Sequence, residues 1–291
     1  IVAQHNLGMM YRNGWGVSRD GNEAVRWYKL SAKQGYADAQ FNLGVIYHEG
    51  KAVPQDYIEA AKWYRLAAEQ GSVLAQYNLG IMHRKGQGVP KDHRKAAKWY
   101  KLAAEQGDAD AQYNLGVMYE NGEGVPKDYK EALRLYTLAA NQGKVKAQYN
   151  LGVIYYEGRA VPQAYEEAVR WYTLAAKQGD AMAQFNLASM YEDGHGVSQD
   201  DREAIKFYTL AARQGYATAQ SNLGLMHYNG QGVLADPVIA HMWFNIAAAN
   251  GAESAGANRD IIAKEMTSED ISKAKAMARA CFNSNYEKCG Y

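Results

Sequence analysis

The chain has 291 residues, and its 32 lysines and arginines nearly balance 31 aspartates and glutamates, for a formal net charge of +1. This balance argues against binding of nucleic acid by the protein as a whole, although it is compatible with a local basic patch. The apolar content of 47% is typical of a folded protein, and no apolar run approaches the roughly 18–20 residues that span a bilayer.

An Ala-Gln pair recurs every 36 residues through most of the chain. The pairs begin at Ala3, Ala39, Ala75, Ala111, Ala147, Ala183 and Ala219. A strict period of this length indicates stacked structural repeats rather than one globular core. We predict seven repeats over residues 1–254, as copies at 3–38, 39–74, 75–110, 111–146, 147–182, 183–218 and 219–254, and a C-terminal helical cap over 255–291.

The second copy shows the elements that each repeat should contain. Its first helix is predicted over residues 37–49 and its second over 57–70, because apolar residues recur on one face of a 3.6-residue period in both. Neither apolar stripe can be buried within its own hairpin. Stacking against the neighbouring hairpins would bury both, which predicts an all-α solenoid.

Turn and cap residues agree with these helices. The first helix ends at a glycine in every copy, such as Gly50, and glycine readily adopts the left-handed conformation that closes a helix. An aspartate precedes most second helices as an N-cap, and a glutamate three residues later predicts a capping box. These pairs are Asp20–Glu23, Asp56–Glu59 and Asp128–Glu131. Ala164 provides no cap oxygen, so the fifth second helix should begin less firmly.

Large rings and a repeated asparagine occupy fixed positions. We expect the tryptophans to fill the space between helices, beside tyrosines that follow them directly. The tryptophans are Trp27, Trp63, Trp99, Trp171 and Trp243. The asparagine occurs in all seven copies, from Asn6 to Asn222, although asparagine is a poor helix former. Either it is a buried amide that bonds a neighbouring loop or carbonyl, or the amides form a ladder that binds a peptide backbone.

After Gly251 the repeat pattern ends, and we predict a helix over residues 258–266 and another that begins near Thr267. Both cysteines, Cys281 and Cys289, lie in this cap. A disulfide between them is one interpretation, and two free thiols in a cytosolic protein is the other. The chain begins at Ile1 within an expected helix, with neither methionine nor leader, so we expect a fragment or a processed form.

Positions that vary while the frame repeats are candidates for specificity. One such site near the end of the first helix reads Arg12, His48, Arg84, Glu120, Tyr156, Glu192 and Tyr228, and the loop site that follows begins with Trp15. Residues 75–110 also hold seven basic residues against four acidic ones, which suggests an acidic partner near Arg84, Lys85 and Arg94. The alternative for all of these residues is a solvated rim.

The repeated motif AQxNLGxxYxxGxGVPxDxxxAxxWYxxAAxQG resembles the Sel1-like repeat family, which is close to tetratricopeptide repeats, from Ala3 to Gly251. The resemblance implies a right-handed α/α superhelix with the first helices on its concave side. It also implies adaptor or scaffold roles, often in bacterial secreted or periplasmic proteins. The Cys-rich relatives carry a cysteine pair in each repeat, which this chain lacks.

We therefore predict a non-catalytic scaffold that binds a partner protein or peptide on the concave surface, without a cofactor, a metal or nucleic acid. The alternative is a glycan or small-ligand receptor that uses Trp15, Tyr156 and Tyr228, and a hydrolase is a third hypothesis. The seven histidines show no metal-ligand spacing, so we expect them to pack as ordinary side chains. We expect a periplasmic or secreted location, with a cytoplasmic one as the alternative.

Overall fold

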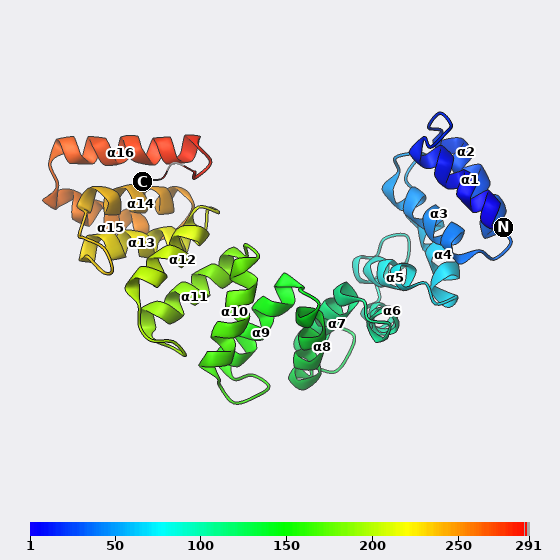
Figure 1. Ribbon diagram of the computed structural model, residues 1–291, viewed down its shortest axis with the longest axis horizontal. Helices are drawn as coiled ribbons and strands as arrows, with labels where there is room; N and C mark the ends of the chain where they lie inside the picture. The colour runs from blue at the N-terminus through cyan, green and yellow to red at the C-terminus, as the bar shows by residue number, and fades with distance from the viewer. Residues whose placement is uncertain (288, 290–291) are drawn as a thin grey trace. The chain divides into compact units, whose positions relative to one another are not determined.

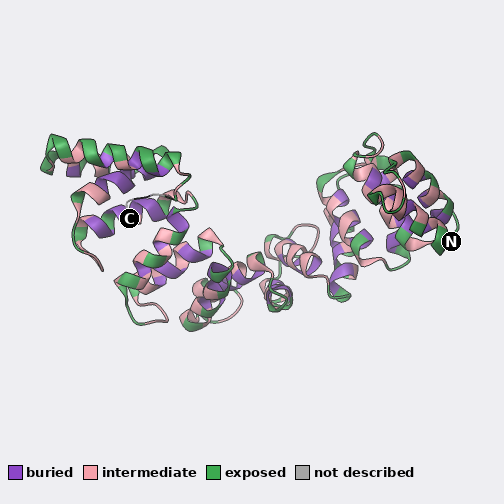
Figure 2. Cartoon of the chain, turned by 45° about the horizontal axis from the view of Figure 1, so that its top comes forward, coloured by how far each residue is buried: buried purple, intermediate pink, exposed green. Residues whose placement is uncertain are grey.

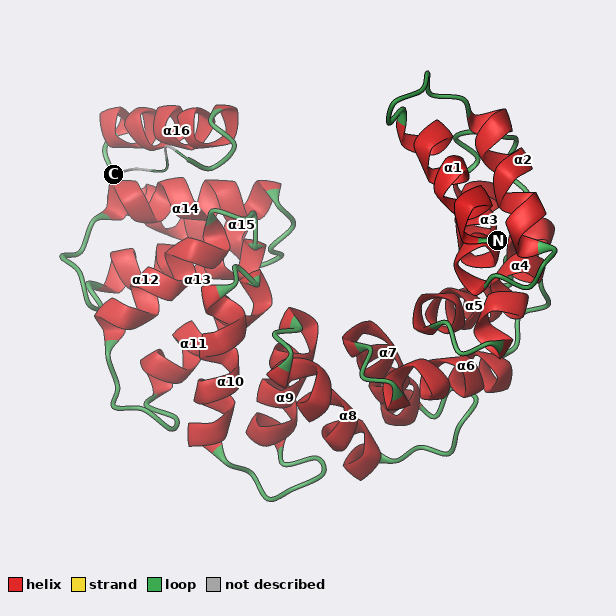
Figure 3. Cartoon of the chain, turned by 45° about the vertical axis from the view of Figure 1, so that its right-hand side comes forward, coloured by secondary structure: helices red, strands yellow, loops and turns green. Residues whose placement is uncertain are grey.

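The computed structural model describes residues 1–287 and 289. The chain divides into two compact units, Ile1–Lys144 and Val145–Tyr291, and each is described by itself. Every regular element in the described residues is a helix, which confirms the all-α prediction (Figure 3).

The first unit consists of four helical hairpins (Figure 1). Their helices are α1 Val2–Asn13, α2 Gly21–Ala32, α3 Ala37–Glu49, α4 Tyr57–Glu69, α5 Val73–Lys85, α6 His93–Glu105, α7 Ala109–Asn121 and α8 Tyr129–Asn141. The second helix of one hairpin packs against the first helix of the next, so that α2 contacts α3 and α4 contacts α5. Stacking of this kind is the predicted solenoid arrangement.

The second unit contains three more hairpins and the cap. Its helices are α9 Val145–Glu157, α10 Tyr165–Lys177, α11 Ala181–Asp193, α12 Asp201–Ala212, α13 Ala217–Asn229, α14 Pro237–Ala249, α15 Ala255–Ile262, the 3₁₀ helix η1 Ala263–Glu265 and α16 Ser268–Asn283. The first cap helix begins three residues before the predicted start, and α15 and α16 both pack against α14.

The predicted caps are confirmed on their aspartate side only. Asp56 accepts hydrogen bonds from two backbone N–H groups of the first turn of α4, at 2.9 and 3.0 Å. A capping box also requires a bond from the backbone N–H of the aspartate to the glutamate side chain, and this part of the prediction is wrong. The Asp56 N–H donates to the Tyr47 carbonyl at 2.9 Å, and Glu59 pairs with Lys62 instead. The other two predicted boxes, Asp20–Glu23 and Asp128–Glu131, depart in the same way. Ala164 makes no side-chain cap, as predicted.

Tyrosines fill the middle of the first six hairpins, and Phe244 takes this place in the seventh. At most 2% of the surface is exposed in Tyr28, Tyr64, Tyr100, Tyr136, Tyr172 and Tyr208. Each ring lies against a small residue of the first helix; a Cβ added to Gly44 would lie 2.4 Å from Cδ1 of Tyr64. The preceding position is rotated by about 100° around the helix and therefore lies at the flank. Trp27 and Trp99 are only half-buried, which corrects the prediction for these two, whereas Trp63, Trp171 and Trp243 are buried. Figure 2 shows how buried and exposed stretches alternate along the helices.

The glutamine of each Ala-Gln pair ties successive hairpins together. Gln76 is buried, donates to the Ala68 carbonyl of the preceding hairpin at 3.1 Å, and accepts from Gln106 of its own hairpin at 2.8 Å. The same pair of bonds joins Gln112 to Ala104 and Gln142. The sequence analysis used this glutamine only as a marker of the period, although a polar residue in every copy was the signal of a structural role.

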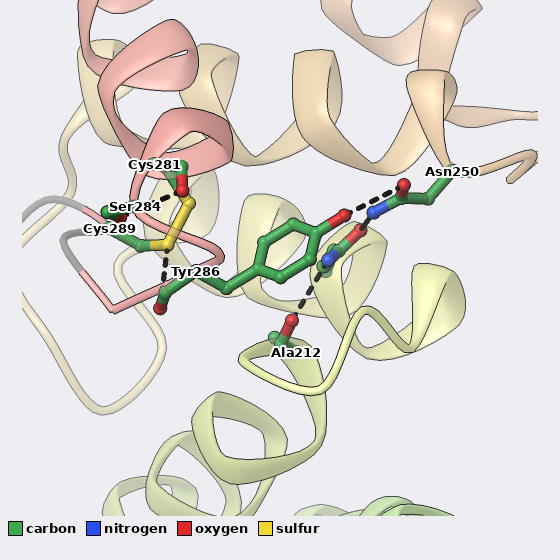
Figure 4. The surroundings of a disulfide bond; sticks show 7 residues. Ala212, Asn250, Cys281, Ser284, Tyr286 and Cys289 are labelled. Carbon is green, nitrogen blue, oxygen red and sulfur yellow. Dashed lines mark hydrogen bonds between the residues drawn. A yellow bond between two sulfur atoms is a disulfide. The ribbon is translucent and has the colours of Figure 1, made fainter.

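The C-terminal segment closes the same series of bonds in the second unit (Figure 4). Gln220 donates to the Ala212 carbonyl at 2.9 Å and accepts from Asn250, and the Tyr286 hydroxyl then donates to Asn250 at 3.0 Å. A disulfide joins Cys281 of α16 to Cys289, which corresponds to the first of the two interpretations of these cysteines. The cross-link encloses Tyr286 and therefore restrains the residue that ends the series.

Candidate functional site

The predicted variable residues of the first unit lie on one exposed face of the first helices, α1, α3, α5 and α7. Arg12, His48, Arg84 and Glu120 are all half-buried. Each interacts with the buried tyrosine of its own hairpin; Glu120, for example, accepts from the Tyr136 hydroxyl at 2.7 Å. These side chains are therefore held by the frame rather than extended freely into solvent.

Two of these residues also reach the next repeat. Arg12 donates to Asn42 at 3.2 Å, and Arg84 lies 3.5 Å from Glu123 in a half-exposed ion pair. This pair offsets the charge of Arg84, one of the three cations predicted to face an acidic partner. Lys85 and Arg94 are exposed, on α5 and α6 respectively.

The second unit carries the other three variable residues. Glu192 accepts from the Tyr208 hydroxyl at 2.7 Å, and burial raises the pKa of Tyr208, which keeps this donor protonated. The ring of Tyr156 lies 5.4 Å from that of Tyr165. The Tyr228 hydroxyl donates to Glu265 at 3.0 Å.

The repeated asparagines are half-buried in six copies and exposed at Asn6, so the prediction of a buried amide is wrong. Their partners differ between copies: Asn78 donates to the Leu74 carbonyl of its own helix at 2.8 Å, whereas Asn42 accepts from Arg12 of the preceding repeat. Asn186 of α11 hydrogen-bonds the hydroxyls of Tyr149 and Tyr172, which belong to the preceding hairpin. The second hypothesis, a ladder that binds a peptide, stays a prediction.

A groove of about 320 Å³ lies between α9 and α11 in the second unit, and the buried Tyr172 of α10 is among its lining residues. Its lining consists of Tyr149, Val153, Tyr156, Glu157, Tyr172, Phe185, Asn186 and Ser189. The lining therefore combines four aromatic rings, three of which are tyrosines, with one amide, one serine hydroxyl and one carboxylate. Among the predicted residues, the groove includes Tyr156.

Trp15 lies in a loop of the first unit and is 59% exposed. Glu123, at the equivalent loop position three copies later, pairs with Arg84 instead. The loop position is therefore used differently in different repeats, and the structure gives Trp15 no part in the groove between α9 and α11.

Four histidines are buried, namely His5, His83, His227 and His241. Burial is the largest cause that lowers the pKa of His83, His227 and His241, so these rings favour the neutral form. Within the described residues, no group of three or more His, Cys, Asp or Glu side chains is placed to hold a metal ion. No helix in the described part of the chain is both long and apolar enough to cross a membrane.

The comparisons with known proteins agree with this architecture. The Sel1 repeat model matches seven segments, at residues 1–36, 37–72, 73–108, 109–144, 145–180, 181–216 and 217–251. These segments start two residues before the predicted repeat boundaries. No curated protein matches the chain.

Two solved structures are similar to the chain over most of its length. A Sel1 repeat protein from Oxalobacter formigenes is 36% identical, with a TM-score of 0.71, over 88% of this chain and 74% of its own. A protective antigen of uropathogenic Escherichia coli strains with an SLR fold is 32% identical, with a TM-score of 0.47, over 99% of this chain and 76% of its own. The chain therefore belongs to the Sel1 repeat family.

Proposed function

We propose that the protein is a non-catalytic scaffold that binds a segment of a partner protein in the groove between α9 and α11. Sel1 repeat proteins are generally protein–protein interaction scaffolds. The observation that carries the proposal is the lining of this groove, where aromatic walls enclose a small set of polar groups. Such a combination is typical of recognition sites, because the apolar area contributes affinity and the polar groups fix orientation.

The groove suits an extended segment that presents one apolar side chain. The rings of Tyr149 and Phe185 supply apolar contact, and Asn186 can exchange hydrogen bonds with a backbone amide. Glu157 adds one carboxylate at the edge, which favours a partner without negative charge at that point.

A photo-crosslinking amino acid at Tyr156 tests the proposal in cells that produce the protein. Its matched control carries the crosslinker at Lys177, an exposed residue of the second helix α10. We expect a discrete protein adduct at Tyr156 and none at Lys177, and Val153→Glu should reduce the adduct while Leu174→Glu on α10 leaves it unchanged. Equal adducts at both positions, or no adduct at Tyr156, would contradict the proposal.

The glycan-receptor alternative has less support from the arrangement of the three aromatic residues. The Tyr228 hydroxyl donates to Glu265, and the Tyr156 ring packs beside Tyr165, so two of the three are engaged within the chain. Only Trp15 is largely exposed. Binding of the whole protein to a glycan array, abolished by Trp15→Ala, would favour the receptor over the scaffold.

The proposed location is an oxidising compartment, periplasmic or extracellular. The Cys281–Cys289 disulfide supports this, because such cross-links persist where thiols are not kept reduced. Intact mass after alkylation of the protein from its native source tests the location. Two alkylated cysteines without prior reduction would argue for the cytoplasm.

A further inference from the structure

A second pocket, on a different surface from the groove between α9 and α11, lies in the first unit and has a volume of about 550 Å³. It is enclosed by α4, α5 and α6 and by the loop that joins the last two helices. The lining consists of Ile58, Ala61, Lys62, Arg65, Leu79, His83, Gly88, Val89, Pro90, Lys95, Lys98 and Trp99. We call it the basic pocket.

The base of the basic pocket is apolar. Leu79 and Ala61 are buried, and Trp99 is the half-buried tryptophan noted above. Ile58 lies at the edge with 70% of its surface exposed, although burial of a side chain of this size contributes about 1.5–3 kcal/mol. An apolar group of a partner would remove both Ile58 and Trp99 from water.

The edge of the pocket carries four cations and no carboxylate. Lys62 and Lys95 pair with Glu59 and Asp92 of their own first turns, at 3.1 and 3.8 Å. Arg65 and Lys98 are exposed, and no ion pair joins either to another side chain in the described residues. Two cations are therefore available to an anionic group beside an apolar base.

The repeat frame does not require this charge. The equivalent pocket one repeat later lies between α6, α7 and α8, with a volume of about 320 Å³, and we call it the neutral pocket. Lys101 and Arg134 occupy the positions of Arg65 and Lys98, but Glu131 replaces Lys95. Glu105 also lines the neutral pocket, whereas its counterpart Glu69 does not line the basic pocket. Arg134 pairs with Glu131 at 2.6 Å, and Lys101 lies 3.9 Å from Glu105.

The neutral pocket also lacks the exposed ring. Leu135 replaces Trp99 and is only 2% exposed, so less apolar surface remains for a partner. The same backbone thus carries both kinds of pocket. The individual features of the basic pocket are Lys95 in place of a glutamate, a lining without a carboxylate, and the half-buried Trp99.

We propose that the basic pocket binds an acidic peptide segment of a partner protein that carries one aromatic side chain. The ring would lie on Trp99 and Ile58, and flanking carboxylates would pair with Arg65 and Lys98. Charge complementarity selects the acidic segment, and the apolar base selects the ring rather than an inorganic anion. This binding does not depend on the groove between α9 and α11, so either proposal can fail alone.

The test uses the whole protein and a fluorescent peptide of glutamates with one central phenylalanine. We expect saturable binding by fluorescence anisotropy, and a loss of at least about tenfold in affinity for Arg65→Glu/Lys98→Glu. The matched control is Lys101→Glu/Arg134→Glu, which changes the net charge equally at equivalent exposed positions and should change affinity by less than about twofold. Circular dichroism should show both variants folded.

Two further arms isolate the apolar contact. A peptide with serine in place of phenylalanine, and the variant Ile58→Ser, should each weaken binding by about fivefold or more. Equal losses in the two charge-reversed proteins, or equal binding of the serine peptide, would overturn the proposal. Absence of binding, or tighter binding of a single-stranded oligonucleotide through the same cations, would overturn it as well.

Discussion

The basic pocket and the neutral pocket occupy the same place in the frame, thirty-six residues apart, and differ almost entirely in their exposed residues. Both lie between consecutive second helices over a buried leucine, Leu79 in one and Leu115 in the other. The edge of the basic pocket carries four cations without a carboxylate. The edge of the neutral pocket carries two cations and two carboxylates. The interior therefore fixes where a pocket forms, and the solvent-facing residues fix what it can bind.

The largest expected effect comes from removing an interior residue of α6, the helix that contributes lining residues to both pockets. Tyr100 is 1% exposed and packs against Gly80, where an added Cβ would lie 2.7 Å from its ring. We expect Tyr100→Ala to lower the free energy of unfolding by about 3–5 kcal/mol, because the cavity cannot fully collapse. Urea unfolding followed by circular dichroism measures this loss.

The charge-reversed variant Arg65→Glu/Lys98→Glu should be unfolded in urea in the same way for comparison. It should change the free energy of unfolding by less than about 1 kcal/mol, because both residues are exposed. Similar losses of unfolding free energy in the two variants would show that the residues at the edge of the pocket also stabilise the fold. Such a result would contradict the conclusion that the interior residues determine stability and the exposed residues determine binding.

A smaller effect is expected from the bond that sets one hairpin against the next. Gln112→Leu removes the donor to Ala104 and the acceptor for Gln142 while keeping a side chain of similar size. The loss should be about 1–3 kcal/mol, because two hydrogen bonds worth about 0.5–1.5 kcal/mol each are removed. The Ala104 carbonyl keeps the bond from the Gly107 N–H, and the exposed Gln142 amide can bond water. Gln142→Leu on the exposed side should cost less, and a reversed order of the two variants in urea would contradict the assigned role.

The neutral pocket can be converted to sharpen the comparison. Glu105→Lys/Glu131→Lys places four cations around it, and lysine already occurs at the equivalent positions Lys33 and Lys95. We expect affinity for the glutamate–phenylalanine peptide to appear there, about tenfold weaker than in the basic pocket because Leu135 is buried. Calorimetric stoichiometry should rise from one peptide toward two, and an unchanged stoichiometry would show that charge alone is insufficient.

The smallest effect concerns pH. Burial lowers the pKa of His83 and His227 below the ordinary value near 6.5, and Lys95 lowers that of His83 further. The unfolded chain then binds more protons than the folded one below about pH 6.5, so this part of the stability is present above that pH and falls as the pH falls.

Tyrosine occupies the equivalent position in the other repeats, so His83→Tyr/His227→Tyr is a natural substitution in this frame. The variant should lose less stability than the parent when urea midpoints at about pH 7.5 and 5.5 are compared. An identical loss in the two proteins would exclude these histidines as its source.

The fold could be predicted because the same information is repeated seven times. Helix boundaries in the second copy agree with the prediction to within one residue, since Gly50 and Asp56 act locally through backbone conformation and N-cap bonds. The reciprocal bond from Glu59 could not be foreseen, because the backbone N–H it would need is already bonded to a carbonyl of the preceding helix. The path of the loop between the two helices determines which carbonyl accepts from this backbone N–H.

The candidate sites were less accessible to sequence reasoning, because pockets combine residues from two repeats. The density of positive charge in residues 75–110 predicted an acidic partner there, but Arg84 pairs with Glu123. The basic pocket also includes Lys62 and Arg65, which belong to the preceding copy. Whether a cation is paired depends on side-chain geometry, which the period does not encode. Tyr156 was identified because it varies at a fixed position on an exposed face.

The glutamine bonds also have a consequence for how such a protein can change its length. If residues 75–110 were deleted, Gln112 would meet the Ala68 carbonyl in the place of the Ala104 carbonyl, and its acceptor role toward Gln142 would be unaffected. A deletion that is not a whole number of repeats would place the buried glutamine amide opposite a different part of the preceding helix, without the carbonyl that it bonds. Recombination between near-identical coding segments can therefore lengthen or shorten the array only in whole modules, and each step gains or loses one complete pocket with its own selectivity.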